Sequence, residues 1–158
     1  MLESGVGSGA LSMAMLRCGA HIKGYEIRPD FAQRAKKNVG KFLGDQFLEH
    51  YDVEIRDCYE GIEAQELDRV VLDLPEPWNV VEHAAKSLKP GGIFISYSPS
   101  ITQSLQTTDA LRKNHFAQIK TTETLQRGWN IAGTSTRPDH RMVAHTGFLT
   151  RARLLDYM

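Results

Sequence analysis

The sequence of 158 residues lacks the features that mark membrane, secreted and disordered proteins. It contains no run of about 18 apolar residues and no basic-then-apolar start, so we expect neither membrane insertion nor export. Its two cysteines, Cys18 and Cys58, form no CxxC pair, which favours buried thiols over a disulfide or a metal site. Repeats and low-complexity tracts are also missing. These absences lead us to expect a cytoplasmic globular domain without a metal and without a membrane partner.

Neither positive nor negative charge is in excess, because the chain has 19 Lys plus Arg residues and 19 Asp plus Glu residues. The total charge therefore gives no support for a nucleic-acid partner. The distribution is uneven, however: acids dominate from Glu49 to Glu76, whereas segment 127–153 carries five arginines against the single acid Asp139. Such a basic segment is either a solvated face or a contact for a polyanion. We predict that Arg137 and Arg141 of this segment contact a nucleic acid.

Short apolar segments alternate with helical patterns, which predicts an α/β fold with a largely parallel sheet. The last two strands are expected to close that sheet as an antiparallel pair around a long loop. Asp30 is expected to cap the second helix, and the breaker cluster 89–92 to separate the third helix from the fifth strand. We expect strands at 1–3, 21–27, 52–56, 69–74, 93–97, 118–124 and 143–150, and helices at 10–18, 30–43, 80–88 and 102–114.

A glycine-rich turn, Glu3-Ser4-Gly5-Val6-Gly7-Ser8-Gly9, lies between the first expected strand and the first expected helix. Glycines there allow a tight turn and let a ligand approach the backbone closely. Gly5, Gly7 and Ala10 also fit the dinucleotide fingerprint, so a nicotinamide cofactor remains an alternative. Glu3 favours S-adenosylmethionine, because an acid suits the cationic methionine end of that molecule better than a pyrophosphate. The predicted cofactor contacts are Glu3, Gly5, Val6, Gly7, Ser8 and Gly9.

Three residues farther along the chain have the chemistry of nucleoside contacts. Glu26 follows the last glycine of the turn by 17 positions, at the end of a strand, where a carboxylate can accept both ribose hydroxyls. Asp57 is predicted to accept a hydrogen bond from the adenine amino group, and Phe31 to pack on the ribose or the base. The alternative, purely structural interpretation is a solvated strand end for Glu26, a cap for Asp57 and a core aromatic for Phe31.

The hexapeptide Asp73-Leu74-Pro75-Glu76-Pro77-Trp78 follows the fourth expected strand, and ligands of open α/β sheets react at the carboxyl ends of strands. An acid can hold the nitrogen edge of a planar base, prolines stiffen the loop, and an aromatic ring can stack on the base. If the base is adenine, its N1 already has a lone pair. Methyl transfer to N1 then needs only a hydrogen-bond acceptor for the exocyclic amine and a nearby negative charge. We predict that Asp73 is the catalytic residue and that Pro75 and Trp78 contact the substrate. The alternative is that Asp73 is a turn residue at the strand end and Trp78 a core aromatic.

The glycine turn, the segment Tyr25-Glu26-Ile27-Arg28 and the hexapeptide, in this order, resemble the tRNA (adenine-N1)-methyltransferases that modify position 58 in the T-loop. Segments 123–129, 137–142 and 145–149 extend the likeness over nearly the whole chain. The resemblance implies a Rossmann-like class I methyltransferase fold: a mostly parallel seven-stranded sheet with an antiparallel closing strand and helices on both faces. It also implies S-adenosylmethionine as the donor, tRNA as a partner, a homotetramer, and residues 1–158 as the catalytic domain. Cofactor contacts carry over to Gly5 through Gly9, Glu26, Phe31, Asp57 and Asp73, the last also orienting the adenine.

The start of the chain departs from that family. The first expected strand has only Met1 and Leu2 before the polar turn, whereas strands typically have about five residues, and the small N-terminal β-rich domain of the family has no counterpart. We therefore expect a shortened N-terminus. A class I methyltransferase for another substrate, a nicotinamide-dependent dehydrogenase and a truncated RNA-binding scaffold without activity are the alternative functions.

Overall fold

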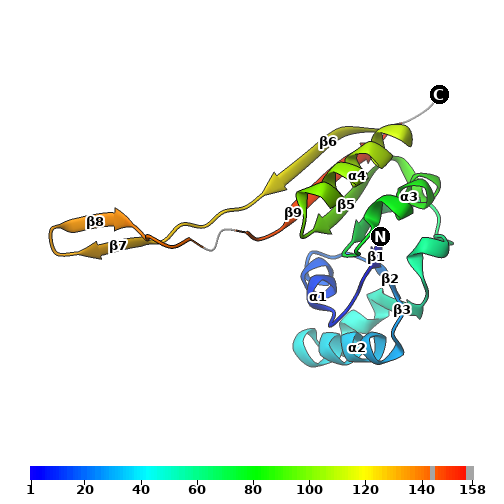
Figure 1. Cartoon of the computed structure of the whole chain (residues 1–158). Helices are drawn as coiled ribbons and strands as arrows, with labels where there is room; N and C mark the ends of the chain where they lie inside the picture. The colour runs from blue at the N-terminus through cyan, green and yellow to red at the C-terminus, as the bar shows by residue number, and fades with distance from the viewer. Residues whose placement is uncertain (143–144, 156–158) are drawn as a thin grey trace.

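The computed structural model describes residues 1–142 and 145–155. The strands of its main sheet are β1 (Leu2–Ser4), β2 (Ile22–Glu26), β3 (Tyr51–Ile55), β4 (Leu67–Leu72), β5 (Leu88–Ser98), β6 (Phe116–Glu123) and β9 (Phe148–Leu154). They lie in the order β3-β2-β1-β4-β5-β9-β6 (Figure 1). Strands β1 to β5 pair in parallel, and β9 runs antiparallel between β5 and β6. The expected class I methyltransferase sheet is thus confirmed.

Two apolar clusters hold helices against this sheet. The helices are α1 (Ala10–Arg17), α2 (Pro29–Leu43), α3 (Val81–Ser87) and α4 (Ile101–Lys113), and the 3-10 turns are η1 (Asp45–His50), η2 (Cys58–Glu60) and η3 (Pro77–Val80). On α2, Ala32, Ala35 and Val39 are buried at helical spacing and belong to a cluster with residues of β2 and β3. The larger cluster joins α3 and α4 to β4, β5 and β9. No helix within the described ranges is long and apolar enough to cross a membrane.

Two local predictions about element ends are wrong. Leu67 pairs with Leu88 and Arg69 pairs with Ile93, so the Pro-Gly segment 89–92 forms an irregularity within β5 and does not precede the strand. The N-cap of α2 is Arg28, and Pro29 occupies the first turn, so Asp30 is inside the helix and does not cap it. Proline suits a first helical position because its missing N–H has no partner there in any case.

Residues 124–142, which follow β6, extend from the body as an arm (Figure 1). Its distal part is an antiparallel hairpin of β7 (Trp129–Ala132) and β8 (Ser135–Pro138), where the sequence predicted a loop. Every residue of β7 is exposed, so no burial pattern identifies it as a strand. The predicted last strand, 143–150, also differs: β9 begins at Phe148 and runs to Leu154, while Val143 and Ala144 lie outside the described residues.

Candidate functional site

The glycine turn and the Asp73 loop meet at the carboxyl ends of two neighbouring strands. Strands β1 and β4 pair in parallel up to Ser4 and Leu72, and the Asp73 N–H continues this pairing by donating to the Ser4 carbonyl oxygen at 2.9 Å. Gly5 has a φ of +83°, and a Cβ there would clash with the carbonyl oxygen of Asp73. Only glycine therefore lets the two backbones approach this closely. Two motifs that are far apart in the sequence form one site.

The Glu26 carboxylate, which was predicted to accept the ribose hydroxyls, lies against the glycine turn. Its Oε2 accepts from the Gly7 N–H at 2.9 Å, and its Oε1 accepts from the Arg28 N–H at 3.0 Å. A carboxylate has about four lone-pair sites, so these bonds leave acceptors for hydroxyl groups. Within the turn, Val6 is only 4% exposed and belongs to the apolar cluster under α2, so it can offer a ligand its backbone alone. Ser8 is exposed.

Glu3 lies beneath the turn and is only 1% exposed. Its Oε2 accepts from the Ser12 Oγ at 2.5 Å, and that hydroxyl is 2.9 Å from the Tyr51 hydroxyl. Its Oε1 is buried and has no hydrogen-bond partner among the described residues. Burial raises the pKa of Glu3 to about 7, and the nearby negative charge of Asp73 adds to this effect. The sequence indicated neither Ser12 nor Tyr51 as a partner of this carboxyl group.

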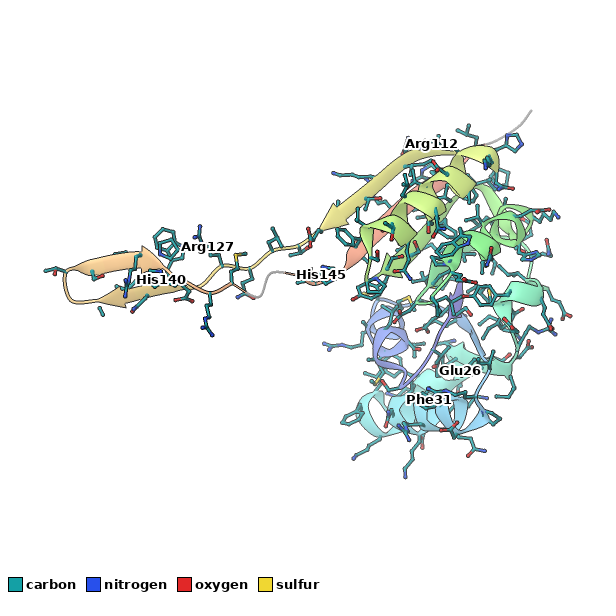
Figure 2. All side chains as sticks on the ribbon, in the orientation of Figure 1. Glu26, Phe31, Arg112, Arg127, His140 and His145 are labelled. Atoms are coloured by element: carbon teal, nitrogen blue, oxygen red, sulfur yellow. The ribbon has the colours of Figure 1, made fainter. Side chains whose placement is uncertain are left out.

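Phe31 and Asp57 lie on the elements that follow β2 and β3. Phe31 is half-buried in the first turn of α2, where the guanidinium carbon of Arg28 is 3.3 Å from the ring centroid. Asp57 is the N-cap of η2, and its Oδ1 accepts from the Tyr59 N–H at 2.9 Å. Figure 2 shows Phe31 near Glu26 in the part of the body formed by β2 and α2. Both residues keep exposed or half-buried atoms at this edge, as a nucleoside contact requires.

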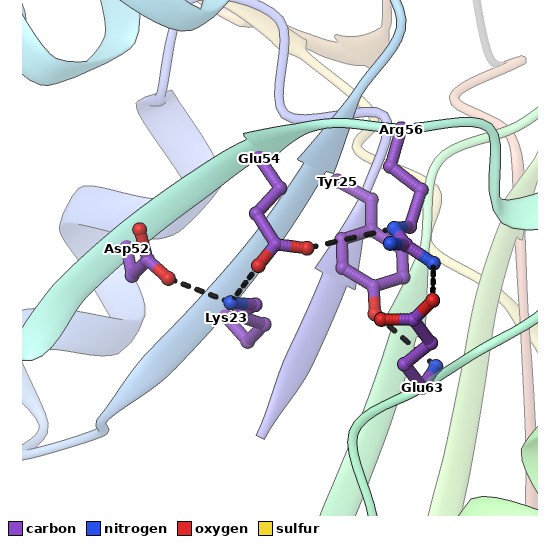
Figure 3. A network of polar contacts seen from close by, with 6 residues as sticks. All are labelled: Lys23, Tyr25, Asp52, Glu54, Arg56 and Glu63. Atoms are coloured by element: carbon purple, nitrogen blue, oxygen red, sulfur yellow. Dashed lines mark hydrogen bonds and ion pairs between the residues drawn. The ribbon is translucent and has the colours of Figure 1, made fainter.

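A polar network joins β2, β3 and the loop that follows β3 (Figure 3). Arg56 pairs with Glu63 at 2.7 Å, and the Glu63 N–H donates to the Tyr25 hydroxyl at 3.3 Å. These bonds connect the loop after β3 to β2. Single exposed ion pairs contribute about 0–1 kcal/mol, so the network mainly fixes the path of the loop. The other members of the network are Lys23, Asp52 and Glu54.

The hexapeptide forms a loop held by side chains from two other segments. The Tyr59 hydroxyl accepts from the Glu76 N–H at 3.0 Å, and the Gln103 Nε2 donates to the Pro75 carbonyl oxygen at 2.8 Å. Trp78 is half-buried in η3, whereas the Asp73 side chain is exposed. Partial burial nevertheless raises the pKa of Asp73 above its usual value. Asp73, Pro75 and Trp78 thus lie on or next to one loop that Tyr59 and Gln103 hold, and no sequence motif indicated these two partners.

The predicted arginines are not at this edge of the body. Arg137 belongs to β8 on the arm, where its guanidinium nitrogen is 2.8 Å from the His140 Nε2, and Arg141 follows shortly after. Figure 2 shows their neighbours Arg127 and His140 on the arm, well separated from Glu26 and Phe31. Within one chain the structure therefore does not bring Arg137 and Arg141 to Asp73.

The glycine turn, Glu26, Asp57 and Asp73 lie at the carboxyl ends of strands. A cavity of about 680 Å³ lies at the opposite edge of the sheet, lined by residues such as Met1, Met15, Cys18 and His21. None of the predicted site residues lines it. In the described part of the chain, no group of three or more His, Cys, Asp or Glu side chains could hold a metal ion.

Three comparisons with known proteins relate the chain to methyltransferases. The sequence profile of the family described as "tRNA methyltransferase complex GCD14 subunit" matches residues 1–137. The tRNA (adenine(57)-N(1)/adenine(58)-N(1))-methyltransferase TrmI of Methanocaldococcus jannaschii is 38% identical over 181 residues, which cover 98% of this chain and 64% of that protein.

Two solved structures superpose on almost the entire chain. A SAM-dependent O-methyltransferase from Thermotoga maritima has a TM-score of 0.86 at 31% identity and covers 99% of this chain and 60% of its own. The tRNA (m1A58) methyltransferase TrmI from Aquifex aeolicus has a TM-score of 0.78 at 28% identity and covers 99% and 62%. The chain thus spans between 60% and 64% of the length of these relatives.

Proposed function

Because the chain belongs to the family of the tRNA methyltransferase complex GCD14 subunit, we propose that it methylates N1 of the adenine at position 58 in the T-loop of tRNA, with S-adenosylmethionine as donor. Two relatives carry names of this activity. The observation that carries the proposal is the backbone contact between Gly5 and Asp73, because it joins a nucleotide-binding turn to a loop suited to a planar base. In this proposal residues 1–158 form the catalytic domain.

The residues of the turn fit S-adenosylmethionine, which supplies the methyl group when bound. The unpartnered Oε1 of Glu3 is a buried acceptor suited to a cationic ammonium group. The half-buried Gly5 and Gly7 and the exposed Ser8 leave backbone that a ligand can approach closely, whereas Val6 and Gly9 are buried. The free lone pairs of Glu26 suit the ribose hydroxyls, and Asp57 and Phe31 suit the adenine.

Asp73 is the proposed catalytic residue. Its carboxylate would accept a hydrogen bond from the exocyclic amine of the target adenine and place a negative charge beside the positive charge that develops on the ring. A base must leave the tRNA stack to reach this loop, and Trp78 offers a ring on which it can stack beside Pro75. Much of the rate enhancement then comes from alignment, because holding the donor and the base in line converts a bimolecular step into an effectively unimolecular one.

We propose that the arm provides contacts outside this site. Its arginines, including Arg137 and Arg141, suit tRNA phosphates. Its exposed apolar side chains Leu125, Trp129 and Ile131 support a contact between subunits, in line with the homotetramer that the resemblance implies.

An oxygen acceptor is the second candidate, because the relative from Thermotoga maritima is titled an O-methyltransferase. A hydroxyl group must lose its proton during transfer, whereas adenine N1 has no proton to lose. The raised pKa of Asp73 would suit proton acceptance from such a hydroxyl group. The two candidates therefore differ in their product and can be separated by analysing it.

The test is calorimetric titration of S-adenosylmethionine into the purified chain, with NADH as control, followed by mass spectrometry of nucleosides from treated tRNA. We expect saturable binding of the donor, no binding of NADH, and N1-methyladenosine that disappears with Asp73→Ala. Donor binding with a product methylated on oxygen would favour the second candidate. Binding of tRNA without any transfer would instead indicate a scaffold, and binding of NADH alone would overturn the proposal.

A further inference from the structure

The carboxamide of Gln103 makes two hydrogen bonds that link α4 to the Asp73 loop. Its Oε1 accepts from the Ser100 N–H at 3.1 Å, which completes a capping box at the start of the helix. Its Nε2 donates to the Pro75 carbonyl oxygen at 2.8 Å. A capping box accepts either Glu or Gln at this position, but only Gln also has a donor. The second bond is therefore separable from the first by substitution.

The bond to Pro75 is one half of a clamp on a single peptide group. The carbonyl oxygen of Pro75 and the N–H of Glu76 belong to the same planar peptide unit. Gln103 holds the oxygen, and the Tyr59 hydroxyl accepts from the N–H at 3.0 Å. With both polar atoms bonded to different segments, this peptide unit cannot rotate without breaking at least one hydrogen bond. In the sequence this peptide unit lies midway between Asp73 and Trp78.

We propose that Gln103 is a positioning residue for methyl transfer, which fixes the Pro75–Glu76 peptide and thereby the place where the target base stacks between Asp73 and Trp78. The inference rests on the proposed function. Gln103 itself would not touch the base or the donor. Its effect is expected on the rate of transfer, because a small misplacement of a reacting group can lower a rate by about 100-fold. Binding of the donor is expected to stay the same, because the turn and Glu26 have no bond to Gln103.

Gln103→Glu separates the bond to Pro75 from the capping box, and Gln103→Met controls for the charge that Glu introduces. Gln103→Glu retains the acceptor for the Ser100 N–H and places a negative charge at a helix N-terminus, where it is favourable, but loses the donor to Pro75. Gln103→Met is similar in length and neutral, and it loses both bonds, which controls for the new charge. Gln106→Glu introduces the same charge on an exposed position of the same helix and is the matched control.

We expect Gln103→Glu and Gln103→Met to lower kcat with tRNA by about 10- to 100-fold at saturating donor, with an unchanged Kd for S-adenosylmethionine by calorimetry. The melting temperature should fall for Gln103→Met and remain the same for Gln103→Glu. Gln106→Glu should behave like the unsubstituted chain. An unchanged kcat for Gln103→Glu would overturn the inference, and so would a loss of donor affinity as large as the loss of rate.

A second readout does not depend on activity. The chain has two tryptophans, Trp78 in the loop and Trp129 on the arm, so a Trp129→Phe background isolates the fluorescence of Trp78. Gln103→Glu should increase quenching of Trp78 by acrylamide in that background, and equal quenching would contradict the clamp. If the unsubstituted chain transfers no methyl group while quenching still responds, the proposed function fails and the clamp on the loop is supported.

Discussion

The carboxyl edge of the sheet and the arm differ in what holds their side chains in place. At the edge, parallel pairing of β1 and β4 brings Gly5 against Asp73, and Glu26 bonds to the turn from the next strand. On the arm, the hairpin of β7 and β8 has contacts mainly within itself, such as the bond between Arg137 and His140. The edge is therefore defined by contacts between several elements of the fold, whereas the hairpin on the arm is exposed and pairs with itself.

The two regions are therefore suited to different roles, alignment of a reacting base at the edge and attraction of phosphates on the arm. Alignment of a reacting base needs positions that are fixed closely, which rigid strand ends and braced loops provide. Electrostatic attraction of a phosphate backbone acts over a long range, so it does not require charges that are held at exact positions. Substitutions at the edge should therefore change rates and stability, and substitutions on the arm should change binding and its salt dependence.

The largest effect is expected at Asp73. Asp73→Ala should lower methyl transfer by about 100- to 1,000-fold, because it removes both the acceptor and the charge beside the developing cation. Its free energy of unfolding should change little, since the side chain is exposed and the backbone bond to Ser4 remains. Transfer is measured with a labelled donor, and unfolding with urea. Asp139→Ala on the arm is the matched control, and an equal loss of transfer there would end the distinction between the two regions.

The next effect is a loss of stability at Gly5. Gly5→Ala should lower the free energy of unfolding by roughly 3 to 4 kcal/mol, because left-handed backbone strain of about 1–2 kcal/mol adds to a clash with the Asp73 carbonyl. Gly133→Ala on the arm is the control: Gly133 has a φ of +55°, but a Cβ there meets nothing within 4 Å. Urea unfolding checks both variants. Equal losses would mean that the backbone contact at the edge contributes nothing.

Much of the edge was predictable because its residues follow directly from strand order. Glu26, Asp57 and Asp73 each end a strand or follow one, and parallel strands end at the same side. The hydrogen bonds that hold the hexapeptide loop were not predictable, because Tyr59 and Gln103 contact it from other segments and no local pattern encodes such contacts. The hairpin on the arm was missed for a different reason: its strands are exposed on both faces, so they lack the alternation by which strands are found.

A smaller effect is expected from the buried carboxyl group of Glu3. Its pKa in the folded chain is about 7, raised from 4.5, so the folded chain retains a proton that the unfolded chain releases. The free energy of unfolding should therefore fall as pH rises from about 4.5 to 7, by on the order of 3 kcal/mol, and level off above 7. Glu3→Gln should remove this slope in urea unfolding between pH 5 and pH 8. If both proteins have the same pH profile, Glu3 does not hold the proton.

The smallest change in stability, and a change only in binding, is expected on the arm. Arg137→Ala and Arg141→Ala should leave the free energy of unfolding within about 0.5 kcal/mol, because both positions are at the surface. Each should weaken tRNA binding and reduce the slope of log affinity against log salt by about 1, as expected for one lost phosphate contact. Arg112→Ala on α4, where Arg112 pairs with Asp109 at 3.1 Å, is the matched control on the body. Filter binding from low to high salt gives the slopes. A reduction for the arm variants alone would establish the arm as the electrostatic contact, whereas an equal reduction for Arg112→Ala would mean that the whole basic surface attracts tRNA and that the arm has no special part in binding.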